Sequence, residues 1–163
     1  MILKVSSHKD FELIESLAKE IWTEHYTPII GKEQIDYMLG KFNTAKYMFK
    51  QAEDSNCLYF LIKKDDEPIG YIAIELRESH LFLNKFYVKL SQRGKGAGKE
   101  AMNFIETQAK EKGLKKITLR VNKLNTSSIT KYEKLGFSKT QSLVQDIGYG
   151  FVMDDYVMEK QLG

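Results

Sequence analysis

Three glycines and two basic side chains stand close together in one short segment of the chain. The residues are, in order, Arg93, Gly94, Lys95, Gly96, Ala97 and Gly98. Glycine allows tight turns and a close approach of the backbone, and the free N–H groups at the start of a helix favour a bound phosphate. Since a strand is expected before this segment and a helix after it, the pattern predicts an anion site. A tight strand-to-helix turn with solvated lysines is the alternative.

Two common phosphate-binding motifs do not fit this segment. A Walker A loop would need glycine in place of Arg93, and it would need serine or threonine, the magnesium ligand, in place of Glu100. The glycine spacing also fits the loose G-x-G-x-x-G/A dinucleotide pattern, but residues 112–132 contain no acidic side chain to hold a ribose. ATP hydrolysis and NAD binding are therefore disfavoured.

The segment does match the R/Q-x-x-G-x-G/A pattern by which GNAT acetyltransferases bind the pyrophosphate of coenzyme A. A second motif, Asn125 followed by YEKLGF at residues 132–137, stands at the distance usual in that family. Residues 88–93 are similar to the family's V-x-P-x-x-R lead-in, and residues 152–160 resemble its last strand. The chain thus resembles the GNAT family, and the helix ending at 21–26 resembles bacterial spermidine/spermine acetyltransferases of that family.

This resemblance implies an N-acetyltransferase that takes acetyl-coenzyme A as co-substrate, needs no metal, and lets a primary amine attack the thioester directly. The N–H of Val88 would stabilise the oxyanion, Asn125 would bind the pantetheine arm, and Tyr132 would protonate the departing thiolate. Packing and helix-capping roles are the alternatives for Tyr132 and Asn125. The implied cofactor-binding residues are Phe86, Tyr87, Val88, Arg93, Gly94, Lys95, Gly96, Ala97, Gly98, Asn125 and Tyr132, and Tyr132 is the implied catalytic residue.

The proton acceptor and the acceptor substrate are less well defined. Polyamine-type relatives commonly have a glutamate four residues before the Val88 position, where this chain has Asn84. Glu75, Tyr87 or Asp154 could act through water, and the base stays unassigned. A small amine such as a polyamine is the expected acceptor. Acidic residues that would attract it are Glu24, Glu33, Asp36, Asp154 and Asp155.

Two other functions remain open at this level. Acetylation of a protein or peptide amine would need an open groove between residues 20–40 and 145–155. A non-catalytic coenzyme A sensor would keep the loop and lose the chemistry; Asn84 favours that function, whereas Tyr132 argues against it.

Apolar periodicity predicts the elements that position these residues. We expect a strand at 2–5 and then a helix capped by Asp10, with a turn through Pro28 and Gly31 beyond it. Two shorter helices should follow, at 32–39 and at 44–54 with Thr44 as cap. The apolar stripe of the first helix consists of Phe11, Ile14, Leu17, Ala18, Ile21 and Trp22.

The middle of the chain changes to the two-residue period of strands. Strands are expected at 57–63, 70–75 and 81–88, with a turn at 65–68, and short connections imply antiparallel neighbours. After the glycine segment come a helix to about 112, a strand at 116–121, a helix at 125–135 and a strand pair at 139–144 and 151–159. The strand, helix and strand around the glycines form a βαβ unit with parallel strands. We predict a single α+β N-acetyltransferase domain over 1–163, with the GNAT fold: helices flanking a mixed, mostly antiparallel sheet.

Composition excludes several classes of protein. The chain has 163 residues, of which 42% are hydrophobic and 29% charged, as in ordinary soluble globular domains, and we expect a cytoplasmic protein. A net charge of +3 is too small for a nucleic-acid partner, and no apolar run is long enough to span a membrane. The three histidines lack metal-ligand spacing, and Cys57, the single cysteine, is expected to be a buried thiol. The oligomeric state is open, a homodimer included.

Overall fold

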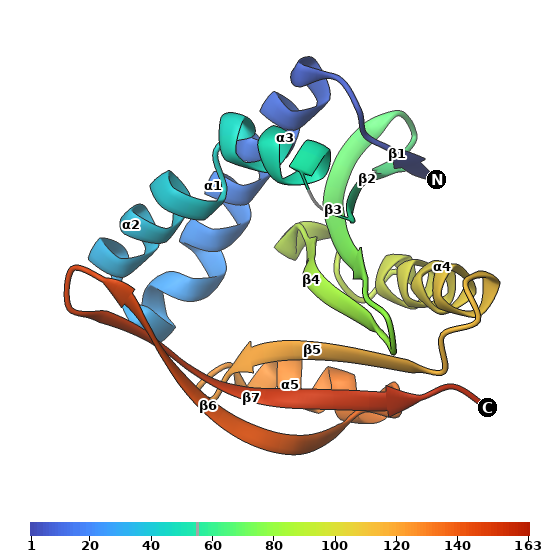
Figure 1. Cartoon of the computed structure of the whole chain (residues 1–163). Helices are drawn as coiled ribbons and strands as arrows, with labels where there is room; N and C mark the ends of the chain where they lie inside the picture. The colour runs from blue at the N-terminus through green and yellow to red at the C-terminus, as the bar shows by residue number, and fades with distance from the viewer. Residues whose placement is uncertain (55) are drawn as a thin grey trace. The chain divides into compact units, whose positions relative to one another are not determined.

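The chain divides into two compact units, and strand β4 (Leu81–Val88) contributes residues to both. The computed structural model describes residues 1–54 and 56–163 (Figure 1). The first unit comprises Met1–Glu75 and Asn84–Ile105, and the second comprises Leu76–Leu83 and Glu106–Gly163. The division falls inside β4, so that its first residues lie in one unit and its last residues in the other.

A two-residue turn joins the long strands of the first unit. β2 (Cys57–Lys64) and β3 (Glu67–Leu76) are antiparallel, and Asp65 and Asp66 between them have φ angles of 52° and 65°. Positive φ at both central positions is the geometry of a type I′ turn, which aspartate tolerates. The predicted turn at 65–68 is thus too long. Pro68 already lies in β3, beside a shift in register that accommodates a residue without an N–H.

Helix α1 (His8–Ile30) buries every residue of the predicted apolar stripe. Its N-cap is Ser7 rather than Asp10, because the Ser7 hydroxyl accepts a hydrogen bond of 3.2 Å from the backbone N–H of Asp10. The predicted turn at Pro28 is also wrong. The helix continues through Pro28 and ends at Gly31, which has a φ of 84°. A proline is tolerated there because it removes only one hydrogen bond, near the exposed end of the helix.

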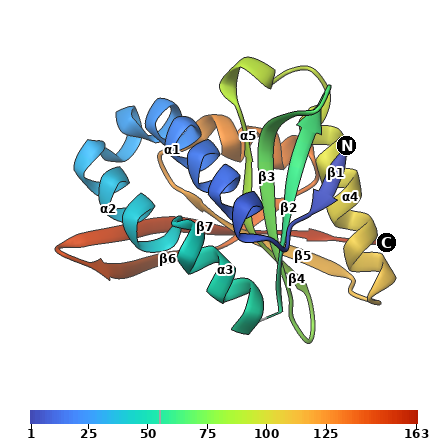
Figure 2. The same ribbon diagram turned by 90° about the horizontal axis from the view of Figure 1, so that it is seen from above.

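Two shorter helices complete the helical layer of the first unit. α2 (Lys32–Phe42) and α3 (Ala45–Asp54) follow the predicted order, and both pack on α1 (Figure 2). Thr44 caps α3 as predicted, since its hydroxyl accepts a hydrogen bond from the Tyr47 N–H at 3.1 Å. The ring of Phe11 lies 5.8 Å from Phe49 of α3 and 5.3 Å from Tyr59 of β2, which joins the helices to the sheet. Among the described residues, no helix is long and apolar enough to cross a membrane.

The second unit contains the end of α4 (Ala97–Glu111), β5 (Lys116–Asn122), α5 (Thr126–Lys134) and a hairpin of two long strands. The hairpin strands, β6 (Ser138–Gly148) and β7 (Phe151–Gln161), are antiparallel and extend side by side to a common tip (Figure 1). Gly113, with a φ of 70°, ends α4, where the Leu114 N–H donates to the Ala109 carbonyl at 2.9 Å.

Hydrogen bonds join the strands in the order β1-β2-β3-β4-β5-β7-β6, where β1 is Ile2–Lys4. The pair β4–β5 is parallel, with Leu81 opposite Ile117 and Leu83 opposite Leu119, and α4 connects these two strands. The pairs β1–β2, β2–β3, β5–β7 and β6–β7 are antiparallel. The predicted α+β class, mixed sheet and βαβ unit are therefore confirmed.

Gly70 permits a close approach of β3 to the end of β4. A Cβ atom on Gly70 would lie 2.3 Å from the Tyr87 carbonyl oxygen and 3.1 Å from the Cα of Val88. Both contacts are to backbone, which cannot rotate away as a side chain can. The position of residues 87 and 88 therefore depends on the absence of a side chain at 70.

We predict that Gly70→Ala lowers the free energy of unfolding by about 1–3 kcal/mol, the usual cost of overpacking a filled interior. Gly40→Ala is the matched control, because a Cβ there meets nothing within 4 Å and Gly40 is an exposed residue of α2. That control should raise stability by about 0.5–1 kcal/mol, the helix preference of alanine over glycine. Urea unfolding of both variants measures the difference. Equal effects would contradict the close approach.

Candidate active site

The glycine segment forms an open turn in front of a helix. A short 3₁₀ turn, Leu90–Gln92, follows β4, and Gly94 and Gly96 then have φ angles of 75° and 89°. Helix α4 begins at Ala97, so that Gly98 lies in its first turn rather than in the loop. A Cβ atom on Gly94 or Gly96 would meet nothing within 4 Å, and these glycines are therefore needed for their positive φ and not for packing. The surface around them is left open.

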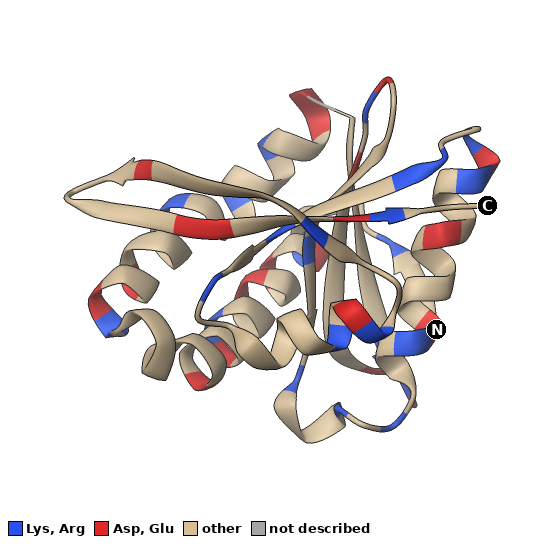
Figure 3. Ribbon diagram, turned by 90° about the horizontal axis from the view of Figure 1, so that it is seen from below, with Lys and Arg blue, Asp and Glu red and all other residues tan. Residues whose placement is uncertain are grey.

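The charge of this segment is wholly positive. Residues 89–99 include Lys89, Arg93, Lys95 and Lys99 and no acidic residue, and Figure 3 shows basic positions along the loop between β4 and α4. Lys89 is engaged, with its Nζ 3.6 Å from carboxylate oxygens of Glu20 and of Glu67. Lys95 and Lys99 are exposed. The open turn, the helix N-terminus and these cations together suit a bound phosphate.

Arg93 ties the loop to two other elements of the first unit. Its Nε donates a hydrogen bond to the Val88 carbonyl at 3.1 Å, and its NH1 lies 3.3 Å from His25 Nδ1 on α1. Because arginine can only donate, the Nδ1 atom of His25 accepts, which leaves the ring proton on Nε2. The side chain of Arg93 thus holds the loop in place, a role that the motif alone did not reveal.

The last residues of β4 adjoin a group of aromatic rings. Tyr87 lies 5.5 Å from Trp22, 6.3 Å from Tyr26 and 5.4 Å from Tyr71, measured between ring centroids. Tyr71 is fully buried, whereas Phe86 and Tyr87 are half-buried. These rings fix the end of β4 on the side that faces α1.

The remaining two predicted cofactor residues, Asn125 and Tyr132, lie in the second unit. Asn125 is buried and is the N-cap of α5, where its Oδ1 accepts a hydrogen bond of 3.4 Å from the N–H of Ser128. Tyr132 is half-buried on α5, and its ring meets that of Phe137 edge-on at 5.6 Å. The capping role of Asn125 is therefore observed.

A chain of hydrogen bonds runs through the core of the first unit beside β4. The Lys85 ammonium donates to the Tyr59 hydroxyl at 3.1 Å and to Asn84 Oδ1 at 3.0 Å. Tyr59 in turn donates to Gln51 Oε1 of α3 at 2.6 Å, and Asn84 Nδ2 donates to the Glu75 carboxylate at 2.7 Å. Sequence reasoning missed Lys85. Its signal was the alternation of β4, in which Leu81, Leu83 and Lys85 share the buried face.

Burial dominates the titration of this network. It lowers the pKa of Lys85 to about 8, and the nearby Cys57 and Glu75 oppose that shift. It also raises the pKa of the Cys57 thiol to about 12, partly offset by the charge of Lys85. Cys57 is 1% exposed, so that the expected buried thiol is confirmed.

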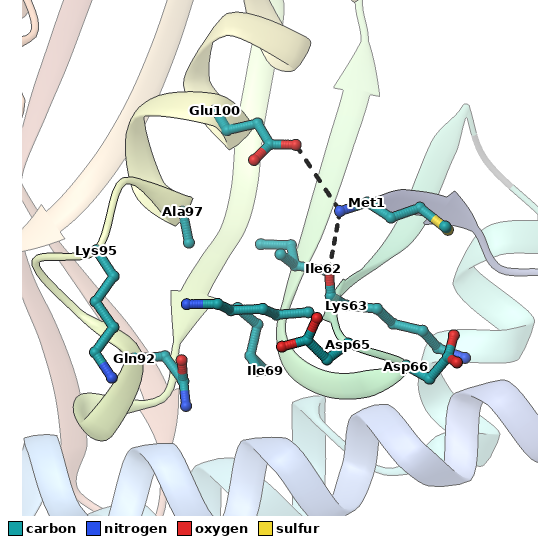
Figure 4. Close-up of a pocket in the computed structure, with 11 residues that line it drawn as sticks. Met1, Ile62, Lys63, Asp65, Asp66, Ile69, Gln92, Lys95, Ala97 and Glu100 are labelled. Carbon is teal, nitrogen blue, oxygen red and sulfur yellow. Dashed lines mark hydrogen bonds and ion pairs between the residues drawn. The ribbon is translucent and has the colours of Figure 1, made fainter.

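A cavity of about 380 Å³ opens beside the loop in the first unit (Figure 4). Gln92, Lys95 and Ala97 line one part of it. The N-terminal amine, at another part, donates to the Lys63 carbonyl at 2.9 Å and lies 3.8 Å from the Glu100 carboxylate. The other lining residues are Met1, Ile62, Lys64, Asp65, Asp66 and Ile69. Because three carboxylates share this space with the lysines, it suits a polyphosphate less well than the glycine turn does.

Comparison with known proteins identifies the class of this chain. Residues 14–137 match the acetyltransferase (GNAT) family. The chain therefore belongs to the GNAT family, whose members are acyltransferases that use acetyl-coenzyme A, as the sequence resemblance implied.

Particular relatives are similar over most of the chain. The spermidine N(1)-acetyltransferase of Thermoplasma acidophilum is 25% identical over 159 residues, which are 95% of this chain and 93% of that protein. The uncharacterised N-acetyltransferase YobR of Bacillus subtilis is 36% identical over 125 residues, 76% of this chain and 48% of that protein. The crystal structure of the PaiA N-acetyltransferase of T. acidophilum in complex with coenzyme A superposes with a TM-score of 0.81 at 23% identity, covering 99% of each chain. That likeness confirms the predicted fold.

The buried lysine makes a prediction about stability and pH. The folded-state pKa of Lys85 is about 8, whereas a lysine in an unfolded chain titrates near ~10.4. Between these values the unfolded state binds more protons, so the free energy of unfolding should rise with pH. Lys85→Met lacks this contribution. The stability of the unaltered chain relative to Lys85→Met should therefore increase between pH 7.5 and pH 10, as measured by urea unfolding. A constant difference would show that folding does not lower the pKa of Lys85.

Proposed function

We propose that residues 1–163 form one N-acetyltransferase domain that transfers the acetyl group of acetyl-coenzyme A to a small primary amine, with a polyamine as the favoured acceptor. The observation that carries this proposal is the open turn at Gly94 and Gly96 in front of α4, with four basic residues and no acidic one in the segment 89–99. The spermidine N(1)-acetyltransferase that is similar over 95% of the chain supports the choice of acceptor.

The residues of the loop fit a pyrophosphate. Backbone N–H groups at the start of α4 are unpaired by the helix itself, because the first turn has no preceding carbonyls to bond. Positive φ at Gly94 and Gly96 turns the backbone without a Cβ that would cover those groups. Lys95 and Lys99 add charge, and Arg93 holds the turn against β4 and α1. The proposed donor-binding residues are Phe86, Tyr87, Val88, Arg93, Gly94, Lys95, Gly96, Ala97, Gly98, Asn125 and Tyr132.

Transfer needs stabilisation of two charges. The backbone N–H of Val88 would donate to the oxyanion that forms when the amine adds to the thioester. Tyr132 would give its phenolic proton to the departing thiolate, and Asn125 would bind the pantetheine arm while capping α5. These roles follow the family motifs at residues 86–98 and 125–137.

The acidic residues expected to attract the acceptor differ in their surroundings. Asp36 pairs with Lys32 at 2.6 Å, Asp154 with Lys123 at 2.7 Å and Asp155 with Arg120 at 3.1 Å. Each of these three carboxylates therefore already has a cationic partner. Glu24 and Glu33 are exposed and better able to attract a cation. The preference for a polyamine therefore depends on relatives more than on these charges.

The decisive experiment follows thiol release by the purified chain with acetyl-coenzyme A and a panel of polyamines, amino acids, aminoglycosides and peptides. Spermidine or spermine should react best, and the rate should fall as salt screens the attraction. Acetyl-coenzyme A at 100 times its Kd should also stabilise the fold by about 2.7 kcal/mol. Gly96→Glu should abolish both effects, since the new side chain and charge oppose a pyrophosphate. No thermal shift with acetyl-coenzyme A would overturn the donor site, and better turnover of neutral amines or peptides would overturn the acceptor.

Tyr132→Phe should lower kcat by about 10²–10⁴-fold, because it removes the proton and keeps the ring. Packing against Phe137 should be retained, so thermal stability and KM for acetyl-coenzyme A should change little. Steady-state kinetics together with thermal unfolding measure the two effects. Turnover within about twofold of the unaltered chain, or loss of cofactor binding, would make Tyr132 a packing residue.

A further inference from the structure

Asn84 connects a hydrogen-bond donor, the Lys85 ammonium, to a hydrogen-bond acceptor, the Glu75 carboxylate. The Lys85 ammonium has only donors, and the Glu75 carboxylate when ionised has only acceptors. Asn84 lies between them, with Oδ1 at 3.0 Å from Lys85 Nζ and Nδ2 at 2.7 Å from Glu75 Oε2. The chemistry of the two neighbours therefore determines which way the amide points, and the amide in turn positions one oxygen of Glu75.

The amide also explains why a carboxylate at position 84 would be out of place in this chain. A second carboxylate at hydrogen-bond distance from Glu75 would repel it, and one of the two would hold a proton at neutral pH. An amide at 84 places no second charge beside Glu75. Glu75 on β3 thus lies beside the β4 position, Asn84, at which the family resemblance implied a glutamate.

We propose that Glu75 takes up the proton of the acceptor amine, by way of water, and that Asn84 and Lys85 are positioning residues for it. This inference rests on the proposed function. Glu75 is half-buried near the end of β3, where water can reach it, whereas Lys85 at the other end of the hydrogen-bond chain is 7% exposed.

The proton balance of the transfer is complete with this assignment. The acceptor ammonium gives one proton through water to Glu75, and the lone pair so freed forms the bond from nitrogen to the thioester carbon. The adduct then has a positive nitrogen and an oxyanion. When the adduct collapses, the bond from carbon to sulfur breaks and the thiolate takes a proton from Tyr132. The nitrogen then gives its second proton to the Tyr132 phenolate. Glu75 finally releases its proton to solvent.

Other groups around this network do not compete with Glu75. Cys57 is paired directly opposite it on β2, and burial raises the pKa of that thiol to about 12. Burial also raises the pKa of Tyr59 far above neutrality. Asp154, a candidate base from the sequence, pairs with Lys123 at 2.7 Å. Glu75 is a carboxylate that a β4 side chain, Asn84, holds by a hydrogen bond of 2.7 Å.

The test compares Glu75→Gln with a control, Glu67→Gln. Glu67 is a carboxylate on the same strand, and among the ion pairs of the described residues it pairs only with Lys89. Glutamine keeps an acceptor for Asn84 and cannot take a proton. We expect kcat/KM of Glu75→Gln to fall on the order of 100-fold at pH 7, and that of Glu67→Gln to stay within about twofold. The deficit of Glu75→Gln should shrink as pH approaches the acceptor's own pKa, ~10.4 for a lysine-like amine, because the amine then arrives without its proton.

A double variant separates proton transfer from structure. Glu75→Gln combined with Asn84→Glu returns a carboxylate to the β4 position of relatives, and it should recover on the order of tenfold of the lost rate. A deficit that is constant with pH and is not rescued would overturn the assignment, as would full activity of Glu75→Gln. Absence of thiol release by the unaltered chain with every amine would instead overturn the proposed function, and this assignment with it.

Discussion

The burial of one ammonium group constrains how the first unit is built. A charged lysine can lie in a protein interior only if its donors are met and its charge is compensated. Lys85 satisfies this requirement through Tyr59 of β2 and its neighbour Asn84, which are held in turn by Gln51 of α3 and Glu75 of β3. Helix α3 and strands β2 and β3 are thereby linked to β4, the strand that leads to Val88 and the glycine turn.

Contacts hold the chain on both sides of the 3₁₀ turn Leu90–Gln92. On one side Gly70 lets the backbone at Tyr87 and Val88 pack against β3, and on the other Arg93 bonds to the Val88 carbonyl and to His25. The conformation of the loop is thus determined by protein contacts, with the basic residues that flank Gly96 left at the surface. A loop that is ordered in advance loses less conformational entropy on binding a substrate.

Features with a local cause could be predicted from the sequence. The glycine turn, the stripe of α1 and the cap at Thr44 each depend on residues within a few positions of one another. The N-cap of α1 could not be predicted from local sequence, because Ser7 and Asp10 are both good capping residues. In the structure the Ser7 hydroxyl accepts the capping hydrogen bond. Pro28 does not end α1, because tertiary packing of the helix outweighs one lost hydrogen bond. The link from Glu75 through Asn84 to Lys85 could not be predicted, because it depends on how two strands are paired.

Glu75 could be predicted only as one of three candidate bases, because the pairing of the strands was uncertain. Asn84 by itself suggested a lost base, and Glu75 lies nine positions away in the sequence and at 2.7 Å in space. The alternation of β4 does place the charge of Lys85 on the apolar face of the strand. An ionisable residue in such a place indicates a buried hydrogen-bond or charge partner on a neighbouring strand.

Cys57 has a practical consequence for biochemistry on this protein. It is the single cysteine of the chain, it is 1% exposed, and its thiol pKa is raised by burial to about 12. Thiolate, and not thiol, is the form that reacts with disulfide reagents and electrophiles. Cys57 in the folded protein should therefore not react with sulfhydryl dyes, and the dye signal in an assay should come from free coenzyme A. A cysteine introduced at a surface position can likewise be labelled without first replacing Cys57.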